Sequence, residues 1–181
     1  MRRTYLDTGV LIDAASGKGA RAETALGLLK EPNRVFLSCP YLDLELLPQV
    51  ILNHRPRQQA FLEAYLAATE RVEDMDSIFR EAFREASRSA VSGMDALHIG
   101  AAHLLNADEF ITTEKPGKAI YKNTLGAGRL PRRVRINAHN DRSRPSPGGG
   151  WWPRCDAAVS YLPAAKWYAR SPDSRFRDSI L

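Results

Sequence analysis

Cysteine is scarce in the sequence, and long apolar runs are absent. The 181 residues include only two cysteines, Cys39 and Cys155, which cannot build a disulfide framework or a pair of CxxC metal motifs. No run of about 18 apolar residues occurs, so no membrane span is expected. Asp7 and Asp13 interrupt the apolar stretch near the N-terminus, which argues against a signal peptide. Together these absences favour a protein of the reduced cytoplasm without a membrane anchor.

Excess positive charge is missing from most of the chain. The formal net charge is +5, yet residues 126–181 hold 11 Lys and Arg against 4 Asp and Glu. Residues 1–125 therefore hold 15 basic and 17 acidic side chains, a net charge of −2. The basic character belongs to the C-terminal segment, so the two parts are considered separately.

Residues 126–181 also lack apolar periodicity. They begin with GAGRLPRRVRINAHNDRSRPSPGGGWWPR, which is rich in Gly, Pro and Arg. Such a composition cannot bury enough surface to offset the entropy of ordering the chain. We therefore expect a globular domain at residues 1–125, followed by a mostly irregular, largely disordered basic extension. Because RRVRIN at 132–137 can form a final strand, the domain has an alternative end at residue 137.

Short apolar segments alternate with helical patterns in the first part of the chain. Tyr, Leu, Val and Phe next to turn residues predict strands at 2–7, 33–38 and 109–114. Apolar spacing predicts helices at 10–16, 20–30, from Pro40 onwards with a kink at Pro48, and at 57–70, 76–90 and 94–107. This alternation predicts an α/β fold, a three-layer α/β/α sandwich around a short parallel sheet.

Four acidic residues stand at the ends of these elements. Asp7 ends the first strand, and Glu45 lies one turn into the helix after the second strand. Asp95 opens an Ala-rich helix, and Glu114 ends the last of the three strands. Strand carboxyl ends and helix amino ends meet at one edge of a parallel sheet, where ligands bind. The four acids could therefore converge.

Convergence of the acids calls for a counter-charge. Two carboxylates about 4 Å apart repel by roughly 4 kcal/mol at an effective dielectric constant near 20. A divalent cation removes that cost, and Mg²⁺ and Mn²⁺ prefer hard oxygen ligands. The pattern therefore predicts a site for one of these ions.

The segments that carry the acids resemble the four signature segments of the PIN domain. They read YLDTGVLID, LDLELL, MDALHIGAA and FITTEK. PIN domains are metal-dependent ribonucleases, and many are the toxins of VapBC-type toxin–antitoxin pairs. The resemblance covers residues 3 to about 122 and implies that Asp7, Glu45 and Asp95 are the three core acids and the metal ligands. Glu114, the fourth catalytic acid of this reading, stands where the family more often has Asp.

The resemblance also implies an activity, a cofactor and partners. It predicts an endoribonuclease with Mg²⁺ or Mn²⁺, an RNA substrate, a cognate antitoxin, a homodimer and a cytoplasmic location. Thr8 and Thr112 match hydroxyl positions beside the first and last acids, and Thr113 lies next to Thr112 as a further supporting residue. Basic side chains around the pocket would bind the RNA backbone by counterion release; the candidates are Arg2, Arg3, Lys115, Lys118 and Lys122.

Several of these residues have simpler interpretations. Asp7 could cap the helix that follows it, and Asp95 could complement the dipole of its helix. Glu114 could pair with Lys115. Thr112 and Thr113 could be ordinary strand-end residues.

Two further ambiguities concern helical positions. Asp43 rivals Glu45, and the two cannot share a helix face because a helix turns about 100° per residue. Glu45 is preferred since Leu46 and Leu47 follow it, as in the family segment. His98 and His103 are five positions apart, unlike the i, i+4 pair of a helical zinc site. Packing or a hydrogen bond near Asp95 is therefore favoured for His98.

Other functions remain open at this stage. One is a non-catalytic RNA-binding or protein-interaction module that keeps the PIN fold. Another is a metal-dependent phosphatase or DNA nuclease with a similar acid cluster, because no short motif separates RNA from DNA.

Overall fold

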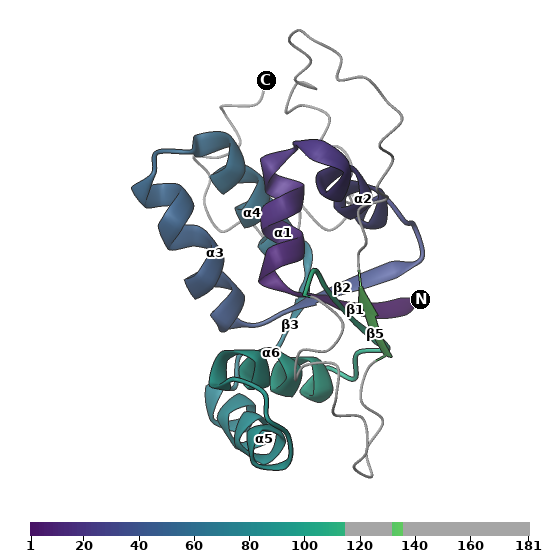
Figure 1. The fold of residues 1–181 in the computed structure, drawn as a ribbon, viewed down its shortest axis with the longest axis vertical. Helices are drawn as coiled ribbons and strands as arrows, with labels where there is room; N and C mark the ends of the chain where they lie inside the picture. Colours follow the sequence, from purple (N-terminus) through teal and green to yellow (C-terminus); the bar gives the residue numbers. More distant parts are fainter. Residues whose placement is uncertain (115–131, 136–181) are drawn as a thin grey trace, which may run out of the picture.

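A five-stranded parallel sheet forms the middle layer of the protein (Figure 1). The computed structural model describes residues 1–114 and 132–135. The strand order is β3-β2-β1-β4-β5, and every neighbouring pair is parallel. The strands are β1 (Arg2–Leu6), β2 (Arg34–Ser38), β3 (Glu70–Arg71), β4 (Glu109–Thr112) and β5 (Arg132–Arg135).

Helices cover both faces of the sheet, which confirms the three-layer α/β/α fold (Figure 1). On one side lie α1 (Thr8–Ser16), α2 (Gly19–Leu29), α3 (Pro40–Leu52) and α4 (Pro56–Ala68). On the other side lie α5 (Met75–Arg88) and α6 (Gly93–Leu104). None of the helices within the described residues is long and apolar enough to span a membrane.

The elements follow the sequence pattern closely. The break between the first two helices falls at Gly17, whose φ of 62° is left-handed and suits glycine. Helix α3 runs from Pro40 to Leu52 with Pro48 inside it. Strand β5 falls within the predicted segment 132–137. The remainder of the predicted C-terminal extension lies outside the described residues.

Strand β3 was not expected from the sequence. The helix predicted at 57–70 ends earlier, at Ala68. Glu70 and Arg71 then pair with Leu37 and Ser38 of β2. Two residues are too few to show alternation, so only pairing with a neighbouring strand reveals this element.

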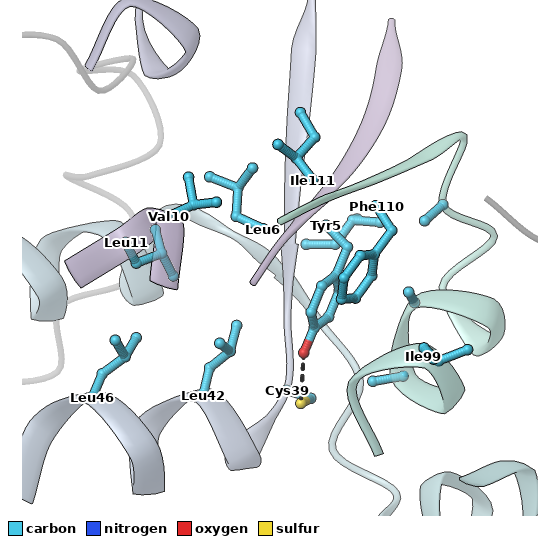
Figure 2. Close-up of a cluster of buried hydrophobic side chains, with 14 of the residues drawn as sticks. Tyr5, Leu6, Val10, Leu11, Cys39, Leu42, Leu46, Ile99, Phe110 and Ile111 are labelled. Atoms are coloured by element: carbon cyan, nitrogen blue, oxygen red, sulfur yellow. Dashed lines mark hydrogen bonds between the residues drawn. The ribbon is translucent and has the colours of Figure 1, made fainter. Parts of the chain in front are cut away.

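The two central strands bury side chains on both faces (Figure 2). Leu6 and Ile111 face α1, whereas Tyr5 and Phe110 face α6. Successive side chains of a strand point to opposite faces, so one strand contributes to both apolar layers. The Tyr5 and Phe110 rings stack with centroids 5.4 Å apart and planes at 7°. This packing fixes the relative position of the strands.

The order of the strands creates a topological switch point at one edge of the sheet. The chain moves outwards from β1 to β2 and β3, then returns to place β4 on the other side of β1. Ligands of open α/β sheets bind outside the carboxyl ends of the strands at such a switch point. Here the switch point lies between the carboxyl ends of β1 and β4.

Candidate active site

Asp7 lies at the switch point between β1 and β4. It follows β1 directly and is the N-cap of α1, where its Oδ1 accepts a hydrogen bond of 2.8 Å from the Thr8 amide. Its Oδ2 accepts a hydrogen bond of 2.6 Å from the Thr112 hydroxyl at the end of β4. The capping interpretation of Asp7 is therefore correct, but one carboxylate oxygen faces the neighbouring strand end.

Burial disfavours the ionised form of the Asp7 carboxylate. Burial raises the pKa of Asp7, and the negative charge of Asp95 raises it further. Hydrogen bonds from Thr112 and Thr8 and the charge of His98 oppose this shift without cancelling it. The electrostatic effect of Asp95 indicates that the two acids share one region of the protein.

Glu45 reaches the same region from α3. Its Oε2 accepts a hydrogen bond from the Thr8 hydroxyl and lies 2.9 Å from Nε2 of His98. The hydrogen bond to His98 lowers the pKa of Glu45, and this effect together with the Thr8 bond outweighs burial. Glu45 is therefore held as a carboxylate.

The structure separates Glu45 from its rival, Asp43. The two oxygens of Asp43 accept hydrogen bonds of 2.8 and 2.5 Å from the guanidinium of Arg71. This bidentate pair ties the start of α3 to β3. Asp43 thus has a structural partner on another side of α3, whereas Glu45 contacts Thr8.

Asp95 lies in the first turn of α6. The hydroxyl of Ser92 caps this helix by accepting a hydrogen bond of 3.1 Å from the Asp95 amide. A carboxylate here is stabilised by the helix dipole, so the simpler interpretation also holds. The cap fixes the backbone of Asp95, which is half-buried.

The residues that follow β4 lie beside the first turn of α1. The Glu114 amide donates a hydrogen bond of 3.1 Å to the Thr112 hydroxyl, which in turn donates to Asp7. The Thr113 hydroxyl lies so close to Gly9 that a Cβ at this position would collide with it. This close approach explains why glycine follows Thr8.

His98 is buried and hydrogen-bonded, as the sequence analysis favoured, and the acid that it contacts is Glu45. Its other ring nitrogen, Nδ1, lies 2.8 Å from the Tyr5 hydroxyl, which lies 3.1 Å from Cys39 Sγ. Burial opposes a charge on the ring, but interactions with Cys39 and Glu45 outweigh it and raise the pKa of His98 to about 9. Sequence analysis did not select Tyr5 or Cys39, because neither carries a recognisable local signal.

The acids are linked in pairs. Thr8 contacts both Asp7 and Glu45, and the charge of Asp95 raises the pKa of Asp7. Within residues 1–114 and 132–135, no group of three or more His, Cys, Asp or Glu side chains is close enough to form a preassembled metal site. The donors themselves are hard carboxylate oxygens, which suit Mg²⁺ or Mn²⁺. Each such oxygen has two acceptor sites, so the bonds from threonine leave capacity for a cation or its water ligands.

Arg2 and Arg3, two of the predicted RNA-binding residues, do not lie at this switch point. Arg2 and Arg3 lie at the start of β1, and Asp7 follows the opposite end of that strand. Arg3 pairs with Glu70 at 2.8 Å, and Arg2 lies 3.8 Å from Glu109. The lysines of the prediction, Lys115, Lys118 and Lys122, lie outside the described residues.

A cavity of about 940 Å³ lies on another part of the surface, between α5 and α6. Its lining includes Phe79, Phe83, Met94 and Leu97. Because apolar side chains dominate this lining, the cavity is a candidate for protein contact.

Comparisons with known proteins place the chain in a family. The family model described as "PIN domain" matches residues 4–120. A search of curated proteins finds no match.

Two solved structures are similar to this chain. VapBC2 from Rickettsia felis bound to a DNA fragment from their promoter is 15% identical, with a TM-score of 0.56 over 75% of this chain and 99% of that one. A toxin–antitoxin complex from Klebsiella pneumoniae is 19% identical, with a TM-score of 0.49 over 61% of this chain and 86% of that one. At 15% identity the likeness to VapBC2 concerns the fold alone.

Proposed function

Because the chain belongs to the PIN domain family, we propose that it is a metal-dependent endoribonuclease that hydrolyses RNA phosphodiester bonds. The observation that carries this proposal is the bridge at the switch point of the sheet. The Thr8 hydroxyl and amide contact Glu45 and Asp7 respectively, so two acids 38 positions apart in sequence meet there. Asp95 is coupled electrostatically to Asp7.

Asp7, Glu45 and Asp95 are the residues that would hold Mg²⁺ or Mn²⁺. A divalent ion, when bound, supplies an activated water and stabilises charge on the leaving oxygen. The protein contributes carboxylates that are already oriented, since Thr112 fixes one oxygen of Asp7 and Thr8 fixes one oxygen of Glu45. Glu114 is the candidate fourth acid, because Thr112 bonds both its amide and Asp7.

We place the protein in the cytoplasm as the toxin of a type II toxin–antitoxin pair. The supporting observation is the shared fold with VapBC2, a complex of this kind. In this proposal a cognate antitoxin binds the protein, and the lysines that follow β4 contribute to RNA binding with the basic C-terminal segment. A small open reading frame directly upstream would support the pairing, and an isolated gene would contradict it.

We also propose a homodimer. Exposed apolar side chains on α3 and α5 supply a surface that water solvates poorly. The rings of Tyr41 on α3 and Phe79 on α5 lie 6.1 Å apart and connect the two helices. The exposed side chains of this α3/α5 surface are Leu44, Ile51, Leu52, Phe79 and Phe83.

RNA cleavage by the purified protein tests the proposed activity. We expect cleavage with Mg²⁺ or Mn²⁺ and none with EDTA. Asp95→Asn should reduce the rate at least about 100-fold, because even groups behind metal ligands are typically worth 10–100-fold. Asp43→Asn is the matched control, since Asp43 pairs with Arg71, and it should retain activity.

The same assay separates the rival functions. A protein that binds RNA and leaves it intact at every metal concentration would be a binding module. Preferential hydrolysis of DNA would identify a DNA nuclease. Preferential hydrolysis of a phosphate monoester would identify a phosphatase. Any of these results would overturn the proposed endoribonuclease.

A further inference from the structure

His98 and Asp95 are three positions apart on α6, so they lie on the same face of the helix. Asp95 is in the first turn and is partly exposed, whereas the His98 side chain is only 3% exposed. One helix face therefore carries an acid and, beneath it, a buried histidine that contacts another acid, Glu45.

Both ring nitrogens of His98 are occupied. Nε2 lies 2.9 Å from Glu45 Oε2 on α3, and Nδ1 lies 2.8 Å from the Tyr5 hydroxyl on β1. Each ring nitrogen bonds along one direction in the plane of the ring. Two partners on two different elements therefore fix the orientation of the imidazole.

Tyr5 cannot shift to follow the ring. Its side chain is fully buried, its ring stacks on Phe110, and its hydroxyl is 3.1 Å from Cys39 Sγ (Figure 2). The Tyr41 ring packs edge-on against His98 at 6.5 Å. His98 is thus held by the sheet and by the start of α3.

Every hydrogen bond around the His98 ring can have one donor and one acceptor. A carboxylate only accepts, so the His98 nitrogen facing Glu45 carries a hydrogen. The Tyr5 hydroxyl can accept from a protonated Nδ1 or donate to a bare one, and Cys39 Sγ can donate to or accept from that hydroxyl, so the network is satisfied in either state of the ring. A fully satisfied buried network of this kind is rigid.

The effect of this network falls on one oxygen of Glu45. The His98 ring and the Thr8 hydroxyl both donate to Oε2, and no described group bonds Oε1. A carboxylate that is clamped at one oxygen presents the other oxygen in a fixed direction. Groups behind metal ligands orient them in this way.

We propose that His98, held by Tyr5, is a positioning residue that fixes the carboxylate of Glu45 for the divalent cation and the RNA phosphate. This role rests on the proposed function, because the orientation of the Glu45 carboxylate matters only if that carboxylate binds the cation. It gives a function to two buried residues, Tyr5 and His98. His98 acts through Glu45 and is not a ligand.

Metal titration of His98 variants tests the role. Isothermal titration calorimetry with Mn²⁺ on metal-free protein should show that His98→Leu binds the ion about tenfold more weakly than the wild type, or more weakly still. His98→Gln should recover part of that loss, because its amide nitrogen can donate to Glu45. With RNA, His98→Leu should lower kcat and leave KM nearly unchanged, since the basic residues that bind RNA are untouched.

His103 provides a matched control on the same helix. It makes the same kind of contact, with Nδ1 2.7 Å from Oε1 of Glu81 on α5, but Glu81 is not among the acids of the site. His103→Leu should leave Mn²⁺ affinity and kcat unchanged. If both leucine variants lose affinity equally, the effect is general loosening of α6 and the role of His98 is refuted.

A second variant covers the case in which His98→Leu does not fold. Tyr5→Phe removes one hydroxyl and retains the ring that stacks on Phe110. It should weaken Mn²⁺ binding in the same direction as His98→Leu, by a smaller factor. Wild-type affinity in a folded Tyr5→Phe or His98→Leu protein overturns the inference. A wild-type protein that does not bind Mn²⁺ refutes the proposed function itself, and the inference with it.

Discussion

At the scale of single residues, Asp7 serves the fold and the candidate site together. It caps α1 through the Thr8 amide and accepts a hydrogen bond from Thr112 of β4. Its burial nevertheless raises its pKa, which means that the folded protein stabilises the charged form less than water does. An isosteric neutral side chain separates these two effects.

Asp7→Asn should therefore stabilise the metal-free protein. Asparagine caps helices as well as aspartate does, and it removes the charge that burial and Asp95 disfavour. Each kcal/mol relieved should raise Tm by about 2–4 °C for a chain of this size. Thermal denaturation in the presence of EDTA measures the difference, and the stabilisation by added Mg²⁺ should shrink in the variant.

The pH dependence of Asp7→Asn follows from the same shift. A raised folded pKa makes the ionised carboxylate costly above that pKa. The cost disappears once the pH falls below the ordinary value of 3.8, because both the folded and unfolded states are then protonated. The advantage of the variant should thus decline as the pH is lowered. An advantage that is constant from neutral to acidic pH would show that charge is not its cause.

At the scale of elements, the contact between α5 and α6 positions two residues of the site. Gly100 of α6 faces the backbone of α5, where an added Cβ would lie 3.0 Å from the Ala82 nitrogen and 3.1 Å from the Ile78 oxygen. Backbone atoms cannot rotate away as side chains do. The helices can approach this closely because position 100 has no side chain.

Gly100→Ala should lower the free energy of unfolding by about 1 kcal/mol, because the cost of overpacking exceeds the gain in helix propensity. Gly27→Ala in α2 is the matched control, since no atom lies within 4 Å of its added Cβ. That control should raise stability by about 0.5–1 kcal/mol. Urea denaturation measures both. Equal stabilisation in the two variants would mean that α5 moves aside freely.

At the scale of the whole molecule, the α3/α5 surface predicts self-association. Phe83, which is 76% exposed, should be buried between two copies. Phe83→Glu should shift the protein from dimer to monomer in analytical ultracentrifugation, because it places a charge in an apolar interface. Ala20→Glu adds the same charge at an exposed position on α2, outside the α3/α5 surface, and should stay dimeric. A monomeric wild type would contradict the proposed dimer.

The C-terminal segment should be separable from the domain. Truncation after residue 137 retains β5 (Arg132–Arg135) and should leave a folded protein that binds metal. The removed residues 138–181 hold 7 Lys and Arg against 4 Asp and Glu, so RNA affinity should fall and depend less on salt. The slope of log K against log salt should decrease by about 0.7 for each lost phosphate contact. An unfolded truncated protein would place the domain boundary further on, and an unchanged slope would refute the electrostatic role.

The sequence by itself determined the elements and their class. Period-two and period-3.6 apolar patterns, together with Gly and Pro, predicted the fold because these signals are local. The same local logic placed Asp7 and Asp95 at element ends. It missed β3, since two residues carry no period and Glu70–Arg71 are a strand only through β2.

Only the tertiary structure decided the partners of each side chain. Asp43 and Glu45 differ little in local sequence, but Asp43 pairs with Arg71 and Glu45 contacts Thr8. The bond between Tyr5 and His98 joins residues 93 positions apart, and no local pattern encodes it. Such contacts arise when β1, α3 and α6 pack together and their side chains are confined to a single arrangement. The direction in which a buried side chain points is therefore set by the assembled layers of the fold.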